Sequence, residues 1–246
     1  MDYCVAGGRI MPVYEIAGIT VEYDCKFDLL NSRSRKYLAS ECAVPELSLS
    51  VTDEYLESRR ERFPEASDET LEYMGIGTAF YKALLNYGGM MLHASAVALD
   101  GRAYLFSAPS GVGKSTHTAK WLELFGSRAL IVNDDKPAIK KTDGVYYAYG
   151  TPFSGKYDLS FNGGFPVQGI CFLERSQENS IRRLTPGEAI APLFDQTVRP
   201  AESENMDLLC ERADDILNTL AFYHLRCRAD DDAVRTAYEA MKNFGV

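Results

Sequence analysis

The sequence lacks the features that would tie it to a membrane, to secretion or to nucleic acid. No apolar run reaches the roughly 18 residues that a membrane-spanning helix needs. No N-terminal stretch has the basic and then apolar build of a signal peptide. Basic residues are in the minority, because 26 Lys and Arg stand against 35 Asp and Glu, for a net charge of −9. We therefore expect a cytoplasmic protein that binds neither membranes nor nucleic acid.

Zinc and disulfide patterns are missing as well. The six cysteines are scattered and form no C-x-x-C pair. A chain of 246 residues, 46% of them apolar, can bury a large core and needs no disulfide framework. We expect reduced, structural cysteines, and a homo-oligomer is compatible with the sequence. The cysteines are Cys4, Cys25, Cys42, Cys171, Cys210 and Cys227.

The patterns that are present predict two regions. Residues 1–65 are expected to form a β-rich N-terminal region, with two strands around Gly18 and a third over 46–51. Residues 66–246 are expected to form a larger domain that begins with a helix capped at Ser67.

In the larger region, short apolar runs alternate with helical spacings. Regular strand–helix–strand units are few, which favours an α/β core with a mixed sheet over a doubly wound parallel sheet. Strands are expected over 90–99, 103–106, 129–132, 145–149 and 167–173. Helices are expected before Gly88, before Gly126, and over 186–195, 204–221 and 231–243.

The most informative stretch is A-P-S-G-V-G-K-S at 108–115. It matches the phosphate-binding pattern G-x-x-x-x-G-K-[ST] at every fixed position but the first, where alanine replaces glycine. Gly111 and Gly113 would let backbone N–H groups approach phosphate oxygens. Lys114 could reach the terminal phosphates, and the Ser115 hydroxyl could ligate Mg²⁺. The alternative, a glycine turn with a solvated lysine, is disfavoured by the strand and helix on either side. The expected binding residues are Ala108, Pro109, Ser110, Gly111, Val112, Gly113, Lys114, Ser115 and Thr116.

Two adjacent acids, Asp134 and Asp135, follow an apolar strand about 20 positions after Lys114. The carboxyl end of a strand is where α/β sheets present functional side chains. One carboxylate could hold Mg²⁺ together with Ser115, and the other could accept the proton of an attacking hydroxyl. The sequence does not assign the two roles, and one aspartate could instead cap a turn. A second acidic pair, at 214–215, is expected on the exposed face of a helix.

Other candidates each have two interpretations. His93 could steer a proton if the sheet order places it beside the aspartates, and is otherwise a core histidine. Lys156 could supply a second cation to the transferred phosphoryl group, or belong to a surface turn. Arg199 could reach a phosphate, although a surface role explains it as well. His117 is expected on a helix face, and His224 is expected to be structural.

Three of these motifs resemble a known family when they are taken together. Leu92-His93, the S-G-V-G-K-S core and Asn133-Asp134-Asp135 are similar to motifs in the C-terminal catalytic domain of HPr kinase/phosphorylase. The fold of that domain is related to that of ATP-dependent phosphoenolpyruvate carboxykinase. The resemblance covers 88–160 well and the rest in outline. It implies that 66–246 form a P-loop kinase-like domain with ATP on the loop and Mg²⁺ on Ser115 and an aspartate. It also implies that the aspartate pair, helped by His93, activates a serine-type hydroxyl.

The chain also departs from that family. The acidic residue followed by R-G-x-G is replaced by T-P-F-S-G-K at 151–156, so the resemblance does not extend to recognition of HPr or to phosphorolysis. The chain is more similar to small stand-alone HPr-kinase-like proteins, some of which accompany peptide-modifying enzymes and phosphorylate a precursor peptide.

The sequence thus predicts an ATP- and Mg²⁺-dependent phosphotransferase. It would transfer the γ-phosphoryl group to a hydroxyl on a protein, peptide or small molecule. The expected catalytic residues are His93, Lys114, Asp134 and Asp135. One alternative is a non-catalytic nucleotide-binding sensor, and another is a carboxykinase-like lyase acting on a small organic acid. The acceptor, and the choice of ATP over GTP or pyrophosphate, stay open.

Overall fold

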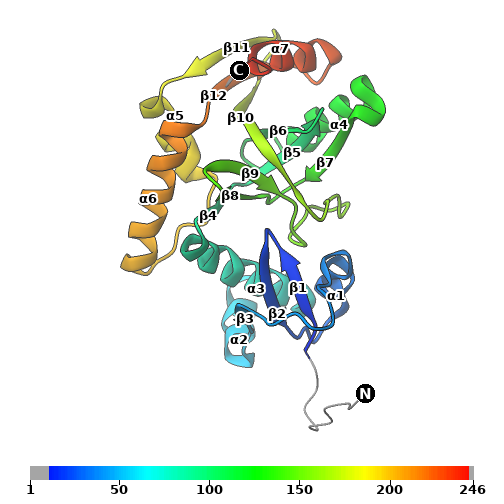
Figure 1. The fold of residues 1–246 in the computed structure, drawn as a ribbon, viewed down its shortest axis with the longest axis vertical. Coiled ribbons are helices and arrows are strands. Elements are labelled where there is room, and N and C mark those ends of the chain that lie inside the picture. Colours follow the sequence, from blue (N-terminus) through cyan, green and yellow to red (C-terminus); the bar gives the residue numbers. More distant parts are fainter. Residues whose placement is uncertain (1–10, 244–246) are drawn as a thin grey trace. The chain divides into compact units, whose positions relative to one another are not determined.

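The computed structural model describes residues 11–243, and contacts between its residues divide the chain into two compact units (Figure 1). The first unit ends at Ile76 and the second begins at Gly77. The sequence placed the division after residue 65, whereas the contacts place it inside α3 (Asp68–Leu84). No helix in the described part has both the length and the apolar composition to cross a membrane.

The first unit contains the three strands that the sequence predicts. β1 (Val13–Ile16) and β2 (Ile19–Tyr23) pair in antiparallel around Ala17 and Gly18, which both have positive φ angles, of 54° and 68°. Two consecutive residues in the left-handed region form the tight turn that matches the twist of a hairpin. β3 (Leu47–Leu49) pairs with β2 in parallel.

The expectation of a β-rich region is corrected by two helices in the same unit. They are α1 (Asp28–Ser34) and α2 (Asp53–Arg62), with a short 3₁₀ helix at Arg35–Tyr37. The amides at the start of α1 are bound from α3, since Leu29 N donates to Glu69 at 2.7 Å and Phe27 N donates to Glu72 at 3.2 Å. Such distant caps leave no local pattern in the sequence.

The second unit is built on a mixed nine-stranded sheet, which confirms the predicted α/β class with antiparallel parts. Its main path runs β4-β8-β9-β10-β6-β5-β7, and β12 joins β10 to β11. The strands are β4 (Gly89–Met91), β5 (Ala94–Leu99), β6 (Arg102–Ser107), β7 (Ala129–Asn133), β8 (Ala138–Thr142), β9 (Val145–Tyr149), β10 (Gly164–Arg175), β11 (Ser180–Leu184) and β12 (Phe222–Cys227). The helices are α4 (Lys114–Phe125), α5 (Pro186–Asp195), α6 (Ser203–Thr219) and α7 (Asp231–Met241), with 3₁₀ turns at Leu85–Tyr87 and Gly126–Arg128.

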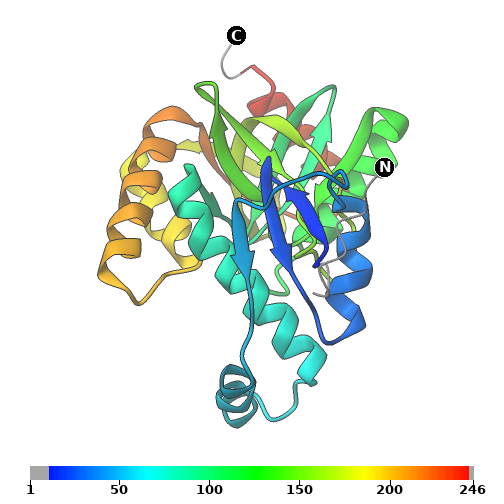
Figure 2. The same cartoon turned by 60° about the horizontal axis from the view of Figure 1, so that its bottom comes forward.

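Helices cover both faces of this sheet (Figures 1 and 2). α5 and α6 pack on a core that includes Leu193, Leu209 and Ile216. α4 and α7 pack on the other core, around the fully buried Trp121 and Val234. Along each of α4 and α7, the side chains that reach this core recur at helical spacing. Each helix therefore buries one stripe of side chains against the strands.

Two strand predictions need correction. The apolar run at 90–99 is two strands, because β4 pairs with β8 whereas β5 pairs with β6 and β7, and the chain changes partners at Leu92 and His93. The apolar run at 129–132, whose composition is typical of a buried strand, forms β7, but β7 is the last strand on its side of the sheet, and only Val132 and Asn133 in it are buried. β8, β11 and β12 were not predicted.

The strand order brings several ends to one edge. β10 runs parallel to β6, and β5 runs antiparallel to both β6 and β7. The carboxyl ends of β6, β7 and β10 therefore lie on the same edge of the sheet, together with the start of β5. The residues that follow or precede those ends are the loop at 108–113, the turn at 134–136, Arg175 and His93.

Candidate active site

The loop between β6 and α4 places glycines where the backbone requires them. Gly111 and Gly113 have φ angles of +81° and +124°, a region that other residues rarely adopt. α4 begins at Lys114 directly after Gly113, and no side chain caps it. The N–H groups of its first turn therefore have no intrahelical partner, and they carry the positive end of the helix dipole.

Arg175, at the end of β10, binds backbone carbonyl oxygens of this loop. Its Nη2 donates to the carbonyl oxygen of Gly111 at 2.5 Å, and its Nε donates to that of Val112 at 3.0 Å. Sequence reasoning missed Arg175, since only the parallel pairing of β10 with β6 brings it to the loop.

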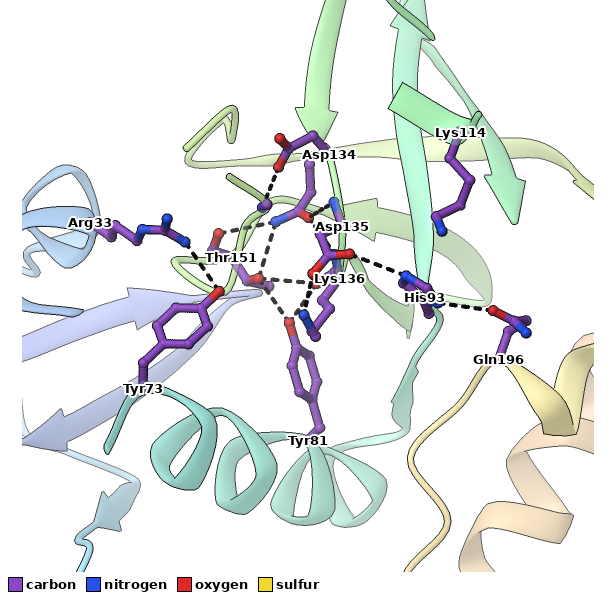
Figure 3. A network of polar contacts seen from close by, with 12 residues as sticks. Arg33, Tyr73, Tyr81, His93, Lys114, Asp134, Asp135, Lys136, Thr151 and Gln196 are labelled. Atoms are coloured by element: carbon purple, nitrogen blue, oxygen red, sulfur yellow. Dashed lines mark hydrogen bonds and ion pairs between the residues drawn. The ribbon is translucent and has the colours of Figure 1, made fainter. Parts of the chain in front are cut away.

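Lys114 extends from α4 toward Asp135 and His93 (Figure 3). Its side chain is buried, and its Nζ donates to the carbonyl oxygen of Ala108 at 2.8 Å. Burial lowers the pKa of Lys114, and Lys136 lowers it further, while Asp135 raises it. A partly desolvated cation attracts an anion more strongly than a cation in water does.

The turn after β7 is shaped by Asn133, which is fully buried. Its Oδ1 accepts from the N–H groups of Asp135 and Lys136 at 2.9 and 2.7 Å. Its Nδ2 donates to the carbonyl oxygen and the hydroxyl of Thr151, at 3.1 and 3.2 Å. The side chain thus replaces a backbone acceptor and closes the turn on which both aspartates are carried.

Asp134 is almost fully buried and faces Gly155. Its Oδ1 accepts from Gly155 N at 2.6 Å. A Cβ on Gly155 would lie 2.8 Å from the other carboxylate oxygen, so the approach requires a glycine at this position. The S-G-K segment that sequence analysis could interpret as a surface turn is therefore part of the site.

Asp135 lies between His93 and Lys136 (Figure 3). His93 Nε2 is 3.3 Å from Asp135 Oδ1, and Lys136 Nζ contacts Oδ2. Burial raises the pKa of Asp135, but the hydrogen bond from His93 and the charge of Lys136 outweigh it and lower the pKa to about 2. Asp135 is therefore a carboxylate throughout the physiological pH range.

Gln196 fixes the position of His93. The backbone carbonyl of Gln196 accepts from His93 N at 2.7 Å, and its side-chain oxygen lies 2.9 Å from His93 Nδ1. Thr197 donates to the carbonyl oxygen of Met91 at 2.6 Å, so three contacts join the segment after α5 to the residues before β5. Gln196 was not predicted, because it is far from His93 in sequence.

These elements line one cleft of about 310 Å³. The cleft brings together His93, six of the predicted loop residues, both aspartates and Lys156, for which the sequence had left a surface turn as the alternative. Its lining residues are His93, Ser110, Gly111, Gly113, Lys114, Ser115, Thr116, Asp134, Asp135, Gly155, Lys156, Tyr157 and Arg175. Among the predicted loop residues, Ala108, Pro109 and Val112 do not line it; Ala108 is buried beneath the loop and contributes its carbonyl oxygen to Lys114.

A larger hollow of about 540 Å³ adjoins the same loop and shares Gly113, Thr116 and Arg175 with the cleft. His117, expected on a helix face, lines this hollow and is buried, with its Nε2 accepting from Trp121 at 3.2 Å. Burial lowers the pKa of His117 to about 4.

The remaining candidates lie outside the cleft. Arg199 is exposed and does not line it. His224 pairs with Glu174 at 3.1 Å, which fits its structural role. Asp214 is exposed on α6, whereas Asp215 accepts from Lys141 at 2.7 Å and Tyr146 at 2.5 Å.

Two other properties of the described residues bear on the predictions. No group of three or more His, Cys, Asp or Glu side chains in residues 11–243 could hold a metal ion by itself. The five cysteines in that range, which excludes Cys4, are free.

Comparison with known proteins gives one family. No curated protein matches the chain. Among solved structures, the chain is similar to the Hpr(Ser) kinase/phosphatase from Coxiella burnetii, with 11% identity and a TM-score of 0.36 over 63% of this chain and 94% of that one. A likeness this weak supports no inference about the activity. The family model described as SynChlorMet cassette protein ScmC matches residues 63–207, which include every residue of the cleft, and the chain belongs to this ScmC family.

Proposed function

We propose that this protein is an ATP- and Mg²⁺-dependent kinase that transfers the γ-phosphoryl group to a hydroxyl on a protein, peptide or small molecule. The observation that carries the proposal is that the glycine loop before α4 and the aspartate turn after β7 line one cleft. Phosphoryl transfer needs positioning of the phosphates and neutralisation of their charge at one place. A glycine loop with a lysine suits the first task, and aspartates that can hold Mg²⁺ suit the second.

In this proposal residues 108–116 are the phosphate-binding loop of a core of the HPr kinase/phosphoenolpyruvate carboxykinase type. The free N–H groups at the start of α4 bind phosphate oxygens, as helix N-termini do. Lys114 exchanges its contact with a carbonyl oxygen for the β- and γ-phosphates. The adjoining hollow of about 540 Å³ would hold the nucleoside.

The donor set of the cleft fits Mg²⁺. Ser115, Asp134 and Asp135 present one hydroxyl and two carboxylates on its lining. Mg²⁺ is typically bound by one or two carboxylates together with substrate phosphates and water, which agrees with so small a set of protein ligands. When bound there, the ion would neutralise charge on the phosphates.

Asp135 is the residue that we assign to the acceptor hydroxyl. Its low pKa makes it a weak base, but a loose transition state needs little proton removal before the phosphoryl group moves. Asp135 would orient the hydroxyl and take its proton as the new O–P bond forms and ADP leaves, and His93, 3.3 Å from Oδ1, would stay hydrogen-bonded to the carboxyl group. Lys156, which also lines the cleft, would add positive charge at the transferred group.

The test compares ATP binding with transfer. Purified protein is titrated with ATP and Mg²⁺ by calorimetry, and candidate acceptors are examined by mass spectrometry after incubation. For Asp135→Asn we expect ATP affinity within about twofold and transfer reduced by about 10² or more. Asp214→Asn, an exposed change on α6, is the control and should match the wild type.

Two results would contradict the kinase. If ATP binds but wild type and Asp135→Asn release ADP at the same acceptor-independent rate, the protein is a nucleotide sensor. If oxaloacetate loses CO₂ in a nucleotide-dependent reaction, the protein is a carboxykinase-like lyase.

A further inference from the structure

His117, in the first turn of α4, is a buried side chain with one hydrogen bond still unmade. It is 4% exposed, and its Nε2 accepts from Trp121 Nε1 at 3.2 Å. An indole N–H can only donate, so Nε2 carries a lone pair and the ring proton lies on Nδ1. His117 therefore has an N–H donor whose place on the ring is set by Trp121.

This donor has no acceptor in the described part of the chain. Across residues 11–243, the bond with Trp121 is the one hydrogen bond that the imidazole makes. His117 lines the hollow of about 540 Å³ beside the loop, and because its Nε2 is turned to Trp121, the Nδ1 edge is left to face that hollow. Buried polar groups in native proteins nearly always have partners, so an unpaired donor that faces a hollow indicates a ligand there.

The ring is held in a fixed position with respect to the loop before α4. The backbone N–H of His117 donates to the carbonyl oxygen of Gly113 at 2.9 Å, which ties the residue to the loop. The Phe106 ring packs against the imidazole, with 4.4 Å between ring centroids and 62° between ring planes. A donor that is already in place loses little entropy when it binds, so a single hydrogen bond from it can select a ligand.

The surroundings of the donor decide which acceptor suits it. Leu173 and Cys227 line the hollow together with His117, whereas the charged residues of its lining are exposed. A ribose hydroxyl or a phosphate would bring a further donor or a charge to this apolar wall. A ring nitrogen of a nucleobase accepts one hydrogen bond and leaves the flat faces of the base against the wall. Adenine offers such nitrogens at N1, N3 and N7, and it has no carbonyl group.

We propose that His117 recognises the base of the bound nucleotide, and that its Nδ1–H donates to a ring nitrogen of adenine in the hollow. This inference rests on the nucleotide binding of the proposed function and assigns a specificity-determining residue to it. Gly113 and Thr116 line both the cleft and the hollow, so a nucleotide with its phosphates on the loop can extend its base toward His117. Pyrophosphate has no group that reaches this donor.

The first experiment removes the acceptor from the ligand. The full chain is titrated by calorimetry, in the presence of Mg²⁺, with ADP and with deaza analogues of ADP that carry C–H in place of N1, N3 or N7. We expect one analogue to bind about tenfold more weakly than ADP and the other two to bind within about twofold of it. Equal binding of ADP and every analogue would overturn the inference. So would a loss confined to the 2′-deoxy or 3′-deoxy nucleotide, because the donor would then bind the ribose.

The second experiment removes the donor from the protein with a matched pair of variants. Glutamine can place its side-chain oxygen near the position of Nε2, so His117→Gln keeps an acceptor for Trp121 and loses the Nδ1 donor. Asparagine can place its N–H near the position of Nδ1, so His117→Asn keeps the donor and loses the acceptor. We expect ADP to bind about tenfold more weakly to His117→Gln and within about threefold of the wild type to His117→Asn. In His117→Gln the selected deaza analogue and ADP should bind alike. Equal ADP affinities in the two variants would overturn the inference, and thermal midpoints without nucleotide report any loss of folding separately.

Nitrogen NMR tests the same donor in the wild type, without any substitution. In protein with ¹⁵N-labelled histidine, we expect the His117 signals of the tautomer protonated at Nδ1. ADP should move the Nδ1 proton downfield, as a new hydrogen bond does, whereas inorganic tripolyphosphate should leave it in place. A proton on Nε2, or an Nδ1 proton that ADP does not move, would overturn the inference.

Tripolyphosphate also separates this inference from the proposed function. It carries phosphates without a nucleoside, so it should bind the wild type and His117→Gln equally, and more weakly than ATP binds the wild type. If tripolyphosphate and ATP bind the wild type equally, the hollow does not hold the base and the inference is wrong, even if the protein transfers phosphoryl groups. If the deaza analogues and variants behave as expected and no acceptor is phosphorylated, the kinase is wrong and the recognition of adenine stands.

Discussion

In the loop before α4, side-chain cations bind backbone carbonyl oxygens, whereas in the turn after β7 a side-chain carbonyl binds backbone N–H groups. Arg175 and Lys114 take the oxygens of the first loop. Asn133 takes the N–H groups of the second. The N–H donors of the first loop therefore remain available to an anion, and the second turn presents the carboxylates of Asp134 and Asp135, with Lys136 paired to Asp135. The loop therefore keeps backbone N–H donors, whereas the aspartate turn offers carboxylate acceptors. The difference arises because side chains bind the carbonyl oxygens of the first and the N–H groups of the second.

The largest expected effect comes from removing the cation of the first loop. Lys114→Met deletes the buried ammonium that would meet the phosphates, and we expect phosphoryl transfer to fall by about 10²–10³-fold. Lys120→Met is the control, because Lys120 lies on the same helix and pairs with Glu123. Steady-state kinetics with both variants measures the difference. If the two variants are equally active, the first loop does not bind phosphate.

Next comes the cap of the second turn. Asn133→Leu removes the acceptor of two half-buried N–H groups and the donor to Thr151, and we expect the free energy of unfolding to fall by about 2 kcal/mol. Urea denaturation measures this loss. Asn133→Asp keeps an acceptor for both N–H groups and should lose less, although it cannot donate to Thr151. Equal losses for the two variants would show that the cap does not hold the turn.

Acid should loosen the first loop through His117, whose backbone N–H bonds to Gly113. Burial lowers the pKa of His117 from 6.5 to about 4, so the unfolded chain takes up the proton first as the pH falls. Its contribution to stability is complete above the unfolded pKa and is lost as the pH falls toward 4. Between pH 7 and pH 5 we expect a loss of about 2 kcal/mol from this group.

The measurement is the pH dependence of urea denaturation in the wild type and in His117→Gln. The difference between the two proteins should shrink as the pH falls, because only the wild type carries the buried imidazole. A difference that is constant from pH 7 to pH 5 would contradict the low pKa.

The smallest expected effect concerns Arg175. Arg175→Leu releases two exposed carbonyl oxygens that water can bind, so the fold should survive while the loop becomes less well positioned. We expect ATP affinity to fall about tenfold, as for the loss of a charged hydrogen bond. Arg226→Leu, on the neighbouring strand β12 and paired with Glu174, is the control in calorimetry. Unchanged affinity in Arg175→Leu would mean that the loop positions itself.

The chemistry of the cleft was predictable where it is contiguous in sequence. The glycines, Lys114 and the aspartate pair follow apolar strands directly, and strand ends of one direction meet at one edge. Arg175 was not predictable, because it reaches the cleft through a parallel strand pair, and Gln196 was not, because it reaches His93 through a long return segment. Tyr157 was also not predicted to line the cleft, because its polar neighbours made the segment resemble an ordinary loop.

The fold was predictable to a similar extent. The helices α5, α6 and α7 have one apolar stripe each and were found close to their observed bounds. β12 was missed because its first residues follow the end of α6 without a turn signal, and the β4–β5 break was hidden in a continuous apolar run. Both cases depend on which strands pair, and strand pairing cannot be inferred from local amino-acid composition.

The irregular register of β10 limits where this chain can tolerate insertions or deletions. The pairing of β10 with β6 shifts between Val167 and Gly169, and from there to Phe172 it is regular. One residue added or removed between Gly169 and Arg175 would turn the guanidinium to the opposite side of the sheet, because side chains alternate. Length variation among related chains should therefore collect outside Gly169–Arg175, where it leaves the guanidinium on the carbonyl oxygens of Gly111 and Val112.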